Sequence, residues 1–254
     1  MRRLIINADD CGKSKVVNAA IEECIQLGCI SSTTVMANMA DLDGAKVLYD
    51  KYKDRISFGA HFDLTEAHPL TQSQILLDYG YFKETDEGLV MCGHDFRHTL
   101  FPKRVRKEIF KELDAQMTKL LDYGFNISHI DSHRHIHYGY GVLPVFVEVA
   151  EKHHITKMRR FKNCMKPGIR LYMGKAWRYE LKCLDNNMMT TSFFCSFSDF
   201  FNKKISDYVL AKDNVSFELM VHPGHPKYEN EIELLKGCFK SIAKENELIN
   251  YKDL

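Results

Sequence analysis

Residues 129–137 read His-Ile-Asp-Ser-His-Arg-His-Ile-His, and the rest of the sequence can be organised around them. Four of these nine residues are histidines, in a chain that has 12 in total. The preceding residues 124–128, Gly-Phe-Asn-Ile-Ser, predict a short buried strand whose carboxyl end carries the histidines. If the extended backbone continued, Asp131 and every second residue after it to His137 would share one face. Imidazole and carboxylate together suit zinc and similar divalent ions, so a metal site is favoured over a loop of hydrogen-bonded histidines.

Composition indicates a globular enzyme-sized protein. The chain has 254 residues, 45% of them hydrophobic, with 35 basic and 34 acidic residues and a net charge of +1, so neither nucleic acid nor a membrane surface is expected as a partner. Its eight cysteines show no C-x-x-C spacing, which indicates reduced thiols. The apolar run after Met1-Arg2-Arg3 is too short for a signal peptide, and no stretch could span a bilayer. We therefore expect a cytoplasmic protein.

Strand and helix patterns alternate along the chain. Apolar or β-branched runs predict further strands at 4–7, 32–37, 56–64, 156–161, 190–195, 215–221 and 248–251. Amphipathic patterns predict helices at 14–27, 42–52, 104–123, 142–152, 169–184, 201–211 and 229–246, with a shorter one near 71–78. We treat residues 1–254 as a single domain with irregular insertions near 66–102 and 162–205.

This alternation predicts the fold class. Strands that alternate with helices form a parallel sheet with right-handed crossovers. Seven or eight such units favour an α/β barrel over a doubly wound sheet. We expect this barrel to be distorted, and whether it closes completely is left open. No G-x-G-x-x-G follows the first strand, which disfavours the dinucleotide-binding version of the doubly wound fold.

The candidate reactive groups recur at the carboxyl ends of the predicted strands, where barrel enzymes carry their chemistry. Those groups are Asp9, Asp10, His61, Asp63, Asp131, His133, Arg159 and His222. A purely structural role would scatter such groups over both edges of the sheet. Asp9 and Asp10 cannot point the same way on an extended backbone, so one can bind a metal while the other accepts a proton. A turn with a helix cap is the open alternative for this pair.

Four segments of the chain resemble the signatures of the YdjC-like carbohydrate deacetylases, a family that includes chitooligosaccharide deacetylases. They are residues 7–12 (NADDCG), 59–65 (GAHFDLT), 129–137 and 222–224 (HPG), in the family's order. Cys11 stands where the family usually has phenylalanine. The resemblance implies a distorted barrel related to the NodB-type polysaccharide deacetylases. The insertions near 66–102 and 162–205 match no signature, and we expect them to set substrate preference.

The same resemblance implies the roles of individual residues. It implies one divalent metal ion, most simply zinc or magnesium, with three ligands: Asp10, His61 and His133. Asp9 would be the general base and His222 the general acid or oxyanion partner. Arg159 would orient the base, with its neighbour Arg160 as the alternative. The remaining histidines of the cluster, at positions 135 and 137, would support the ligands or be structural.

The leading hypothesis is a metal-dependent hydrolase that removes N-acetyl groups from amino sugars or short oligosaccharides and releases acetate. One alternative is a phosphoesterase-type hydrolase with two metal ions. Another is a non-catalytic sugar-binding regulator, against which the retention of Asp9 and His222 counts. Self-association as a homo-oligomer is left open. We expect Trp177 in the core and regard Tyr138 and Tyr140 as better candidates for stacking on a sugar.

Overall fold

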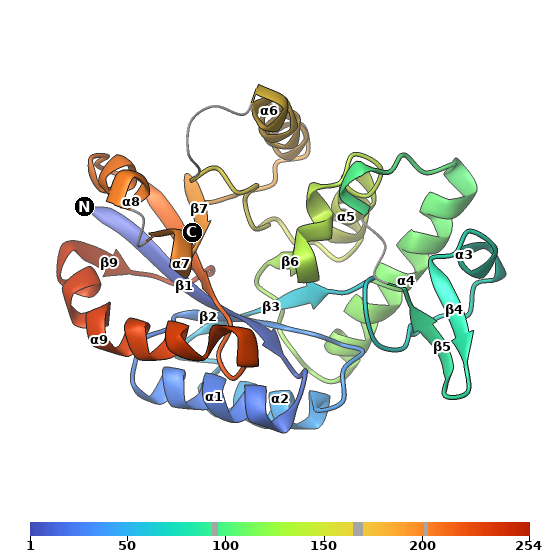
Figure 1. The fold of residues 1–254 in the computed structure, drawn as a ribbon, viewed down its shortest axis with the longest axis horizontal. Coiled ribbons are helices and arrows are strands. Elements are labelled where there is room, and N and C mark those ends of the chain that lie inside the picture. Colours follow the sequence, from blue (N-terminus) through green and yellow to red (C-terminus); the bar gives the residue numbers. More distant parts are fainter. Residues whose placement is uncertain (93–95, 165–169, 201–202) are drawn as a thin grey trace.

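The computed structural model describes residues 1–254 except 93–95, 165–169 and 201–202. Seven strands form one parallel sheet in the order β6-β3-β2-β1-β8-β7, with β9 also paired to β1 (Figure 1). The strands are β1 (Arg2–Cys11), β2 (Ser32–Val35), β3 (Ser57–Phe62), β6 (Ile130–Ser132), β7 (Phe193–Ser196), β8 (Ser216–Val221) and β9 (Asn246–Leu248).

The sheet curls into a distorted barrel. From β1 the path runs through β2, β3 and β6 on one side and through β8 and β7 on the other, so the strands follow chain order around a ring. Single bridges span the gap between the two ends, Ile130 with Met158 and Lys157 with Met189. The predicted α/β barrel is therefore confirmed. The strand expected at 156–161 is reduced to these bridges, because this segment pairs with only one residue on either side.

Helices flank the sheet, with α1, α2 and α9 below it and α6 above it in the view of Figure 1. They are α1 (Lys15–Gln26), α2 (Leu42–Tyr52), α4 (Lys103–Asp122), α5 (Leu143–Lys152), α6 (Arg170–Asp185), α7 (Phe197–Phe200), α8 (Lys203–Leu210) and α9 (Glu229–Glu245). Ser14 caps α1 by accepting a hydrogen bond from the Val17 amide, as predicted. The expected starts of α6 at Ile169 and α8 at Phe201 lie outside the described residues. Within the described part of the chain, no helix combines the length and apolarity that a membrane span requires.

The insertion at 66–102 is more regular than expected. It contains α3 (Gln74–Asp78), a hairpin of β4 (Phe82–Thr85) and β5 (Gly88–Met91), and the 3₁₀ turn η1 (Phe96–His98). The hairpin turns at Asp86-Glu87, and Gly88, the first residue of β5, has a φ of +104° that favours glycine. This turn signal is present in the sequence and could have predicted the hairpin.

Two expectations about aromatic residues are wrong. Trp177 is 66% exposed, because Tyr179 and Cys183 turn the opposite face of α6 toward the interior. Tyr138 is buried, and its hydroxyl donates to the Arg160 carbonyl and accepts from the Lys162 amide, so it packs in the core.

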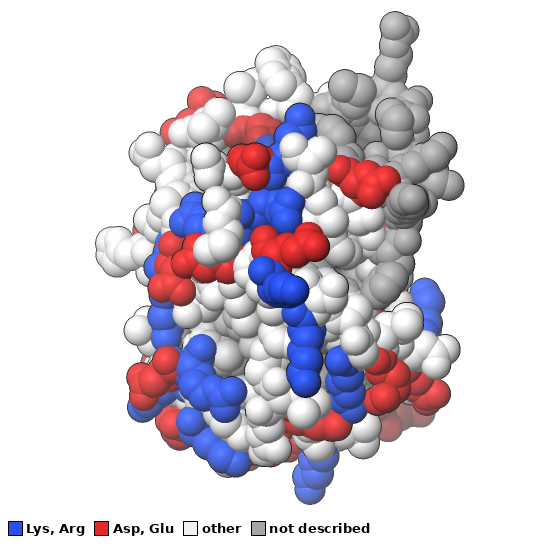
Figure 2. Space-filling model, turned by 90° about the vertical axis from the view of Figure 1, so that its left-hand side faces the viewer, with Lys and Arg blue, Asp and Glu red and all other residues white. Residues whose placement is uncertain are grey.

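On the surface, basic and acidic side chains are interspersed over the face drawn in Figure 2, in keeping with the small net charge.

Candidate active site

Strand register brings the predicted groups to one edge of the sheet. Ala8 of β1 pairs with Val221 of β8, so Asp9 and His222 follow directly on neighbouring strands. On the other side of β2, His61 of β3 pairs with Asp131 of β6. Groups that are as much as 213 positions apart in sequence thus end on adjacent strands, as the barrel prediction required.

Asp10, His61 and His133 form a compact group. Asp10 Oδ1 lies 3.0 Å from His133 Nδ1 and 3.3 Å from His61 Nε2. One ligand atom from each of the three residues lies within 4.8 Å of the others. An aspartate with two imidazoles is a donor set that suits a divalent cation such as zinc.

The second nitrogen of each of these histidines faces another carboxylate. His61 Nδ1 lies 2.6 Å from Asp131 Oδ1, and His133 Nε2 lies 3.5 Å from Glu66 Oε1. Metal-binding histidines usually have their other ring nitrogen held in this way, which fixes the tautomer and the ring direction. The environment of both rings therefore fits a metal-binding role.

Local backbone geometry explains why both aspartates reach the same place. The register between β1 and β2 shifts between Ala8 and Cys11, and Asp10 has a φ of +68°. This irregularity breaks the alternation of an extended strand, so Asp9 and Asp10 both lie within reach of His61.

The expectation that the histidines of 129–137 share a face is wrong beyond His133. The chain leaves β6 after Ser132 and enters the 3₁₀ segment η2 (His133–Tyr138), in which Arg134 and His135 take left-handed φ values of +52° and +54°. His137 turns into the interior, where its Nδ1 lies 2.5 Å from Ser132 Oγ. Only His133 of the three alternate histidines joins Asp10.

Asp9 is held by Arg159. The two terminal nitrogens of Arg159 contact the two oxygens of Asp9 at 2.8 and 2.6 Å, and both residues are buried. Burial would raise the pKa of Asp9, but the guanidinium and the nearby imidazoles hold it well below the usual 3.8. Arg160 instead hydrogen-bonds to Thr190 and the Thr191 carbonyl, so Arg159 is the arginine that contacts the predicted base.

A second group of possible ligands overlaps the first. Asp9, His61 and Asp131 also place carboxylate and imidazole atoms within 4.8 Å of one another. However, Arg159 already contacts both carboxylates, with Nη1 2.6 Å from Asp131 Oδ2. A cation placed there would face the guanidinium charge, so the group around Asp10 is the better metal site.

The two candidate ligand histidines have raised pKa values. Burial lowers the pKa of His61, but Asp131 and Asp10 raise it to about 10. Burial likewise lowers the pKa of His133, while Asp10 and Glu66 raise it to about 9. Both rings are thus cationic near neutral pH without a metal, and a bound divalent ion would replace their protons.

His222 sits at the rim of this group. Its backbone amide donates to Glu231 Oε2 at 2.8 Å, and its Nδ1 lies 3.6 Å from the same oxygen. Its ring stacks on Tyr228, with centroids 4.4 Å apart. His222 also helps to lower the pKa of Asp9. The side chain is partly exposed, which suits a group that exchanges protons with a substrate.

The sequence reasoning missed four supporting residues: Glu66, Glu218, Glu231 and Tyr251. Glu218 carried a usable signal, because it is the one charged residue in the apolar run Ser-Phe-Glu-Leu-Met-Val of β8. Glu66 directly follows the segment 59–65. Glu231 and Tyr251 had no signal, since only the fold brings Glu231 of α9 to the His222 amide and Tyr251 to Glu218.

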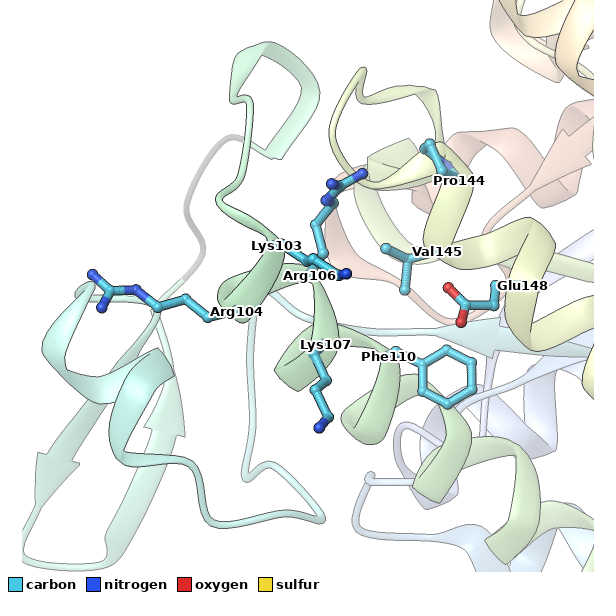
Figure 3. Close-up of a pocket in the computed structure, with 8 residues that line it drawn as sticks. All are labelled: Lys103, Arg104, Arg106, Lys107, Phe110, Pro144, Val145 and Glu148. Carbon is cyan, nitrogen blue, oxygen red and sulfur yellow. The ribbon is translucent and has the colours of Figure 1, made fainter.

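A separate pocket of about 830 Å³ lies between α4 and α5 (Figure 3). Phe110, Val145 and Pro144 supply its apolar wall, with basic side chains from the start of α4 around it. Figure 3 shows Arg104 pointing away from α5; its guanidinium contacts the Tyr79 hydroxyl. None of the candidate site residues lines this pocket, so it is distinct from the group around Asp10.

A curled parallel α/β sheet with a largely buried Asp-His-His group at its carboxyl edge defines a class of barrel able to hold a divalent cation. The YdjC-like protein family matches residues 3–252, and the chain belongs to this family. A carbohydrate deacetylase of Clostridium beijerinckii is 32% identical, covering 99% of this chain and 100% of its own length. A carbohydrate deacetylase of Halalkalibacterium halodurans is 31% identical over 67% of this chain and 68% of its own.

A solved structure shares the fold. A protein of Enterococcus faecalis V583, named as a proposed cellobiose-phosphate cleavage protein, superposes with a TM-score of 0.73 at 20% identity. The superposition covers 99% of this chain and 98% of the other. The overall arrangement of strands and helices is thus common to both proteins.

Proposed function

We propose that this protein is a metal-dependent hydrolase that removes N-acetyl groups from amino sugars or short chitooligosaccharides and releases acetate. The observation that carries the proposal is the meeting of an Asp-His-His group, an arginine-held aspartate and a partly exposed histidine at one sheet edge. The relatives named carbohydrate deacetylase support the substrate class. We further propose a cytoplasmic location, because all eight cysteines are free thiols.

In this proposal Asp10, His61 and His133 hold one divalent ion, zinc or magnesium. When bound, the ion would supply Lewis-acid chemistry, which makes an amide carbonyl more electrophilic and water more acidic. Asp131 and Glu66 keep the two imidazoles oriented toward Asp10.

The chain's own groups then move the protons. Asp9, whose pKa is held below its usual 3.8 and which is therefore ionised at neutral pH, accepts a proton from the water that adds to the acetyl carbon. Arg159 keeps the Asp9 carboxylate in a fixed plane through its two contacts. His222, when protonated, donates its proton to the amine nitrogen as the carbon–nitrogen bond breaks. The products are acetate and the free amino sugar.

The structure gives the two-metal alternative less support. A second ion would need the group formed by Asp9, His61 and Asp131, whose two carboxylates Arg159 already neutralises. We therefore favour one ion per chain, and a measured stoichiometry of two would favour the phosphoesterase reading instead.

The proposal is tested by acetate release from N-acetylated chitooligosaccharides. Wild-type protein should release acetate, chelation should stop it and added zinc or magnesium should restore it. Asp9→Asn should lower kcat by about 10²–10⁴-fold, the usual contribution of a general base. Asp43→Asn on the exposed face of α2 is the matched control and should have wild-type activity. Equal release from all samples, with or without chelator, would contradict the proposed function.

A second part of this experiment tests the role of His222. His222→Gln should lower kcat on amide substrates by about 10²–10⁴-fold, because the amine cannot leave without a proton. On an acetyl ester of nitrophenol, whose leaving group needs no proton, the loss should be much smaller. His153→Gln, at the end of α5, is the control. An equal loss on both substrates would argue against an acid role.

A further inference from the structure

A row of buried polar side chains in contact with one another lies on the far side of Arg159 from the proposed base. Arg159, Glu218 and Tyr251 are fully buried, as is His129 of the segment 129–137. Glu218 lies in the middle of β8, four positions before His222 and hence on the same face of the strand. It therefore points into the barrel interior, and the proposed reaction gives it no chemical step.

Glu218 holds the edge of Arg159 that Asp9 does not touch. Arg159 Nε donates to Glu218 Oε1 at 2.8 Å, while both terminal nitrogens donate to Asp9. A guanidinium is planar and rigid, so fixing its Nε edge fixes the directions of its terminal N–H groups. Together with Asp131, which contacts Nη1 at 2.6 Å, Glu218 thereby helps to set the plane in which the Asp9 carboxylate is held.

Tyr251 in turn fixes Glu218. Its hydroxyl donates to Glu218 Oε2 at 2.5 Å, and its ring stacks on His129 with centroids 3.5 Å apart and planes 7° from parallel. Its backbone is tied on both sides, with its amide donating to Ser57 Oγ and its carbonyl accepting from Lys157 Nζ. The tyrosine therefore has little freedom to move its hydroxyl.

His129 and Gly59 lie at the end of this row of contacting residues. A Cβ atom added at Gly59 would lie 2.4 Å from His129 Cε1, so the imidazole packs directly against the glycine backbone. Burial and the nearby Arg159 charge lower the pKa of His129 well below 6.5, which keeps the ring neutral for stacking. These two residues belong to the segments 59–65 and 129–137, and the proposed mechanism left both without a role.

We propose that Glu218 and Tyr251 are positioning residues of the deacetylation site, which fix Arg159 and through it the Asp9 carboxylate. This inference rests on the proposed function. A buried carboxylate bound to arginine and tyrosine is rarely the most stabilising choice, since well-packed apolar residues often do as well or better. Glu218 contacts Arg159, and Arg159 contacts the proposed base Asp9. This indirect contact is what a positioning role requires.

The test compares Glu218→Gln and Tyr251→Phe with Tyr49→Phe, a buried tyrosine of α2 whose hydroxyl also has one partner, the Asn126 amide. Each of the first two variants should lower kcat about 10–100-fold, the usual effect of a supporting residue, with KM and metal affinity nearly unchanged. The double variant should be no worse than Glu218→Gln alone, because the two act in series. Tyr49→Phe should keep the wild-type kcat.

Crystal structures of the two variants provide a readout that needs no activity. They should show the Arg159 guanidinium turned and the Asp9 carboxylate rotated from its wild-type plane. Wild-type kcat in both variants, or losses that multiply in the double variant, would overturn the inference. If the wild type releases no acetate, the proposed function fails, and an unmoved Asp9 in both structures would then overturn the positioning role separately. If Glu218→Gln does not fold, Tyr251→Phe, which loses one oxygen atom, decides alone.

Discussion

At the residue scale, three of the seven described non-glycine residues with positive φ lie at or beside the candidate ligands. Asp10, Arg134 and His135 all have positive φ values, which cost about 1–3 kcal/mol each in residues other than glycine. Asp10 is itself a candidate ligand, and Arg134 follows another. The strain has a geometric result, because it turns Asp10 toward His61 and takes His135 away from the face of His133. Periodicity alone could not predict which histidines of 129–137 meet the aspartate.

The titration of the two candidate ligand histidines predicts how metal binding depends on pH. With pKa values raised to about 10 for His61 and about 9 for His133, both rings carry protons in the metal-free protein at neutral pH. Metal must displace both protons, so affinity should rise with pH. Below pH 9 the rise should approach about a hundredfold per pH unit, and it should level off above both pKa values.

Calorimetry from about pH 6 to pH 8 checks this dependence. Titration in buffers of different ionisation enthalpy should show the release of about two protons for each bound ion. His133→Gln should reduce the release to about one proton. An affinity independent of pH would show that the ion does not bind these imidazoles.

At the element scale, α4 anchors the start of the insertion at 66–102. Glu112, buried on the inner face of α4, accepts hydrogen bonds from the Leu70 and Thr71 amides and from the Thr71 hydroxyl. One turn later, the Gln116 side chain accepts a hydrogen bond from the Asp63 backbone amide and donates one to the Asp63 backbone carbonyl. Both residues are polar positions in a helix predicted as amphipathic, and their partners could not be read from periodicity.

Glu112→Ala should therefore loosen the insertion. Two backbone amides and one hydroxyl would lose their acceptor, so the free energy of unfolding should fall by about 3 kcal/mol. Urea unfolding measures this loss. Asp122→Asn, an exposed change at the end of the same helix, is the control and should stay within about 0.5 kcal/mol of wild type. A loss no larger than the control's would mean that the insertion is held by its apolar contacts instead.

At the scale of the whole molecule, the parts predicted best are those with a long repeating signal. Helices α2, α4, α5 and α9 begin and end within one residue of their predicted ranges, because each has an apolar stripe of helical period. The barrel was predicted from the alternation of strands and helices. The location of the site at the carboxyl edge of the sheet was predicted from the charged residues at the strand ends. The segment 156–161 and Tyr251 depend on contacts between distant parts of the chain, which no local pattern records.

The two overlapping ligand groups make a prediction for the stability of the whole protein. A metal that binds only the folded state adds about 2.7 kcal/mol at a hundredfold excess over Kd, or roughly 5–10 °C in Tm for a chain of this size. Asp10→Asn should remove most of this shift, whereas Asp9→Asn should keep it, because Asp9 is engaged with Arg159. Thermal scans with and without zinc measure each shift against its own metal-free baseline, so a general loss of stability does not disturb the comparison. The reverse pattern, a shift lost with Asp9→Asn and kept with Asp10→Asn, would place the ion between Asp9, His61 and Asp131 and overturn the ligand assignment.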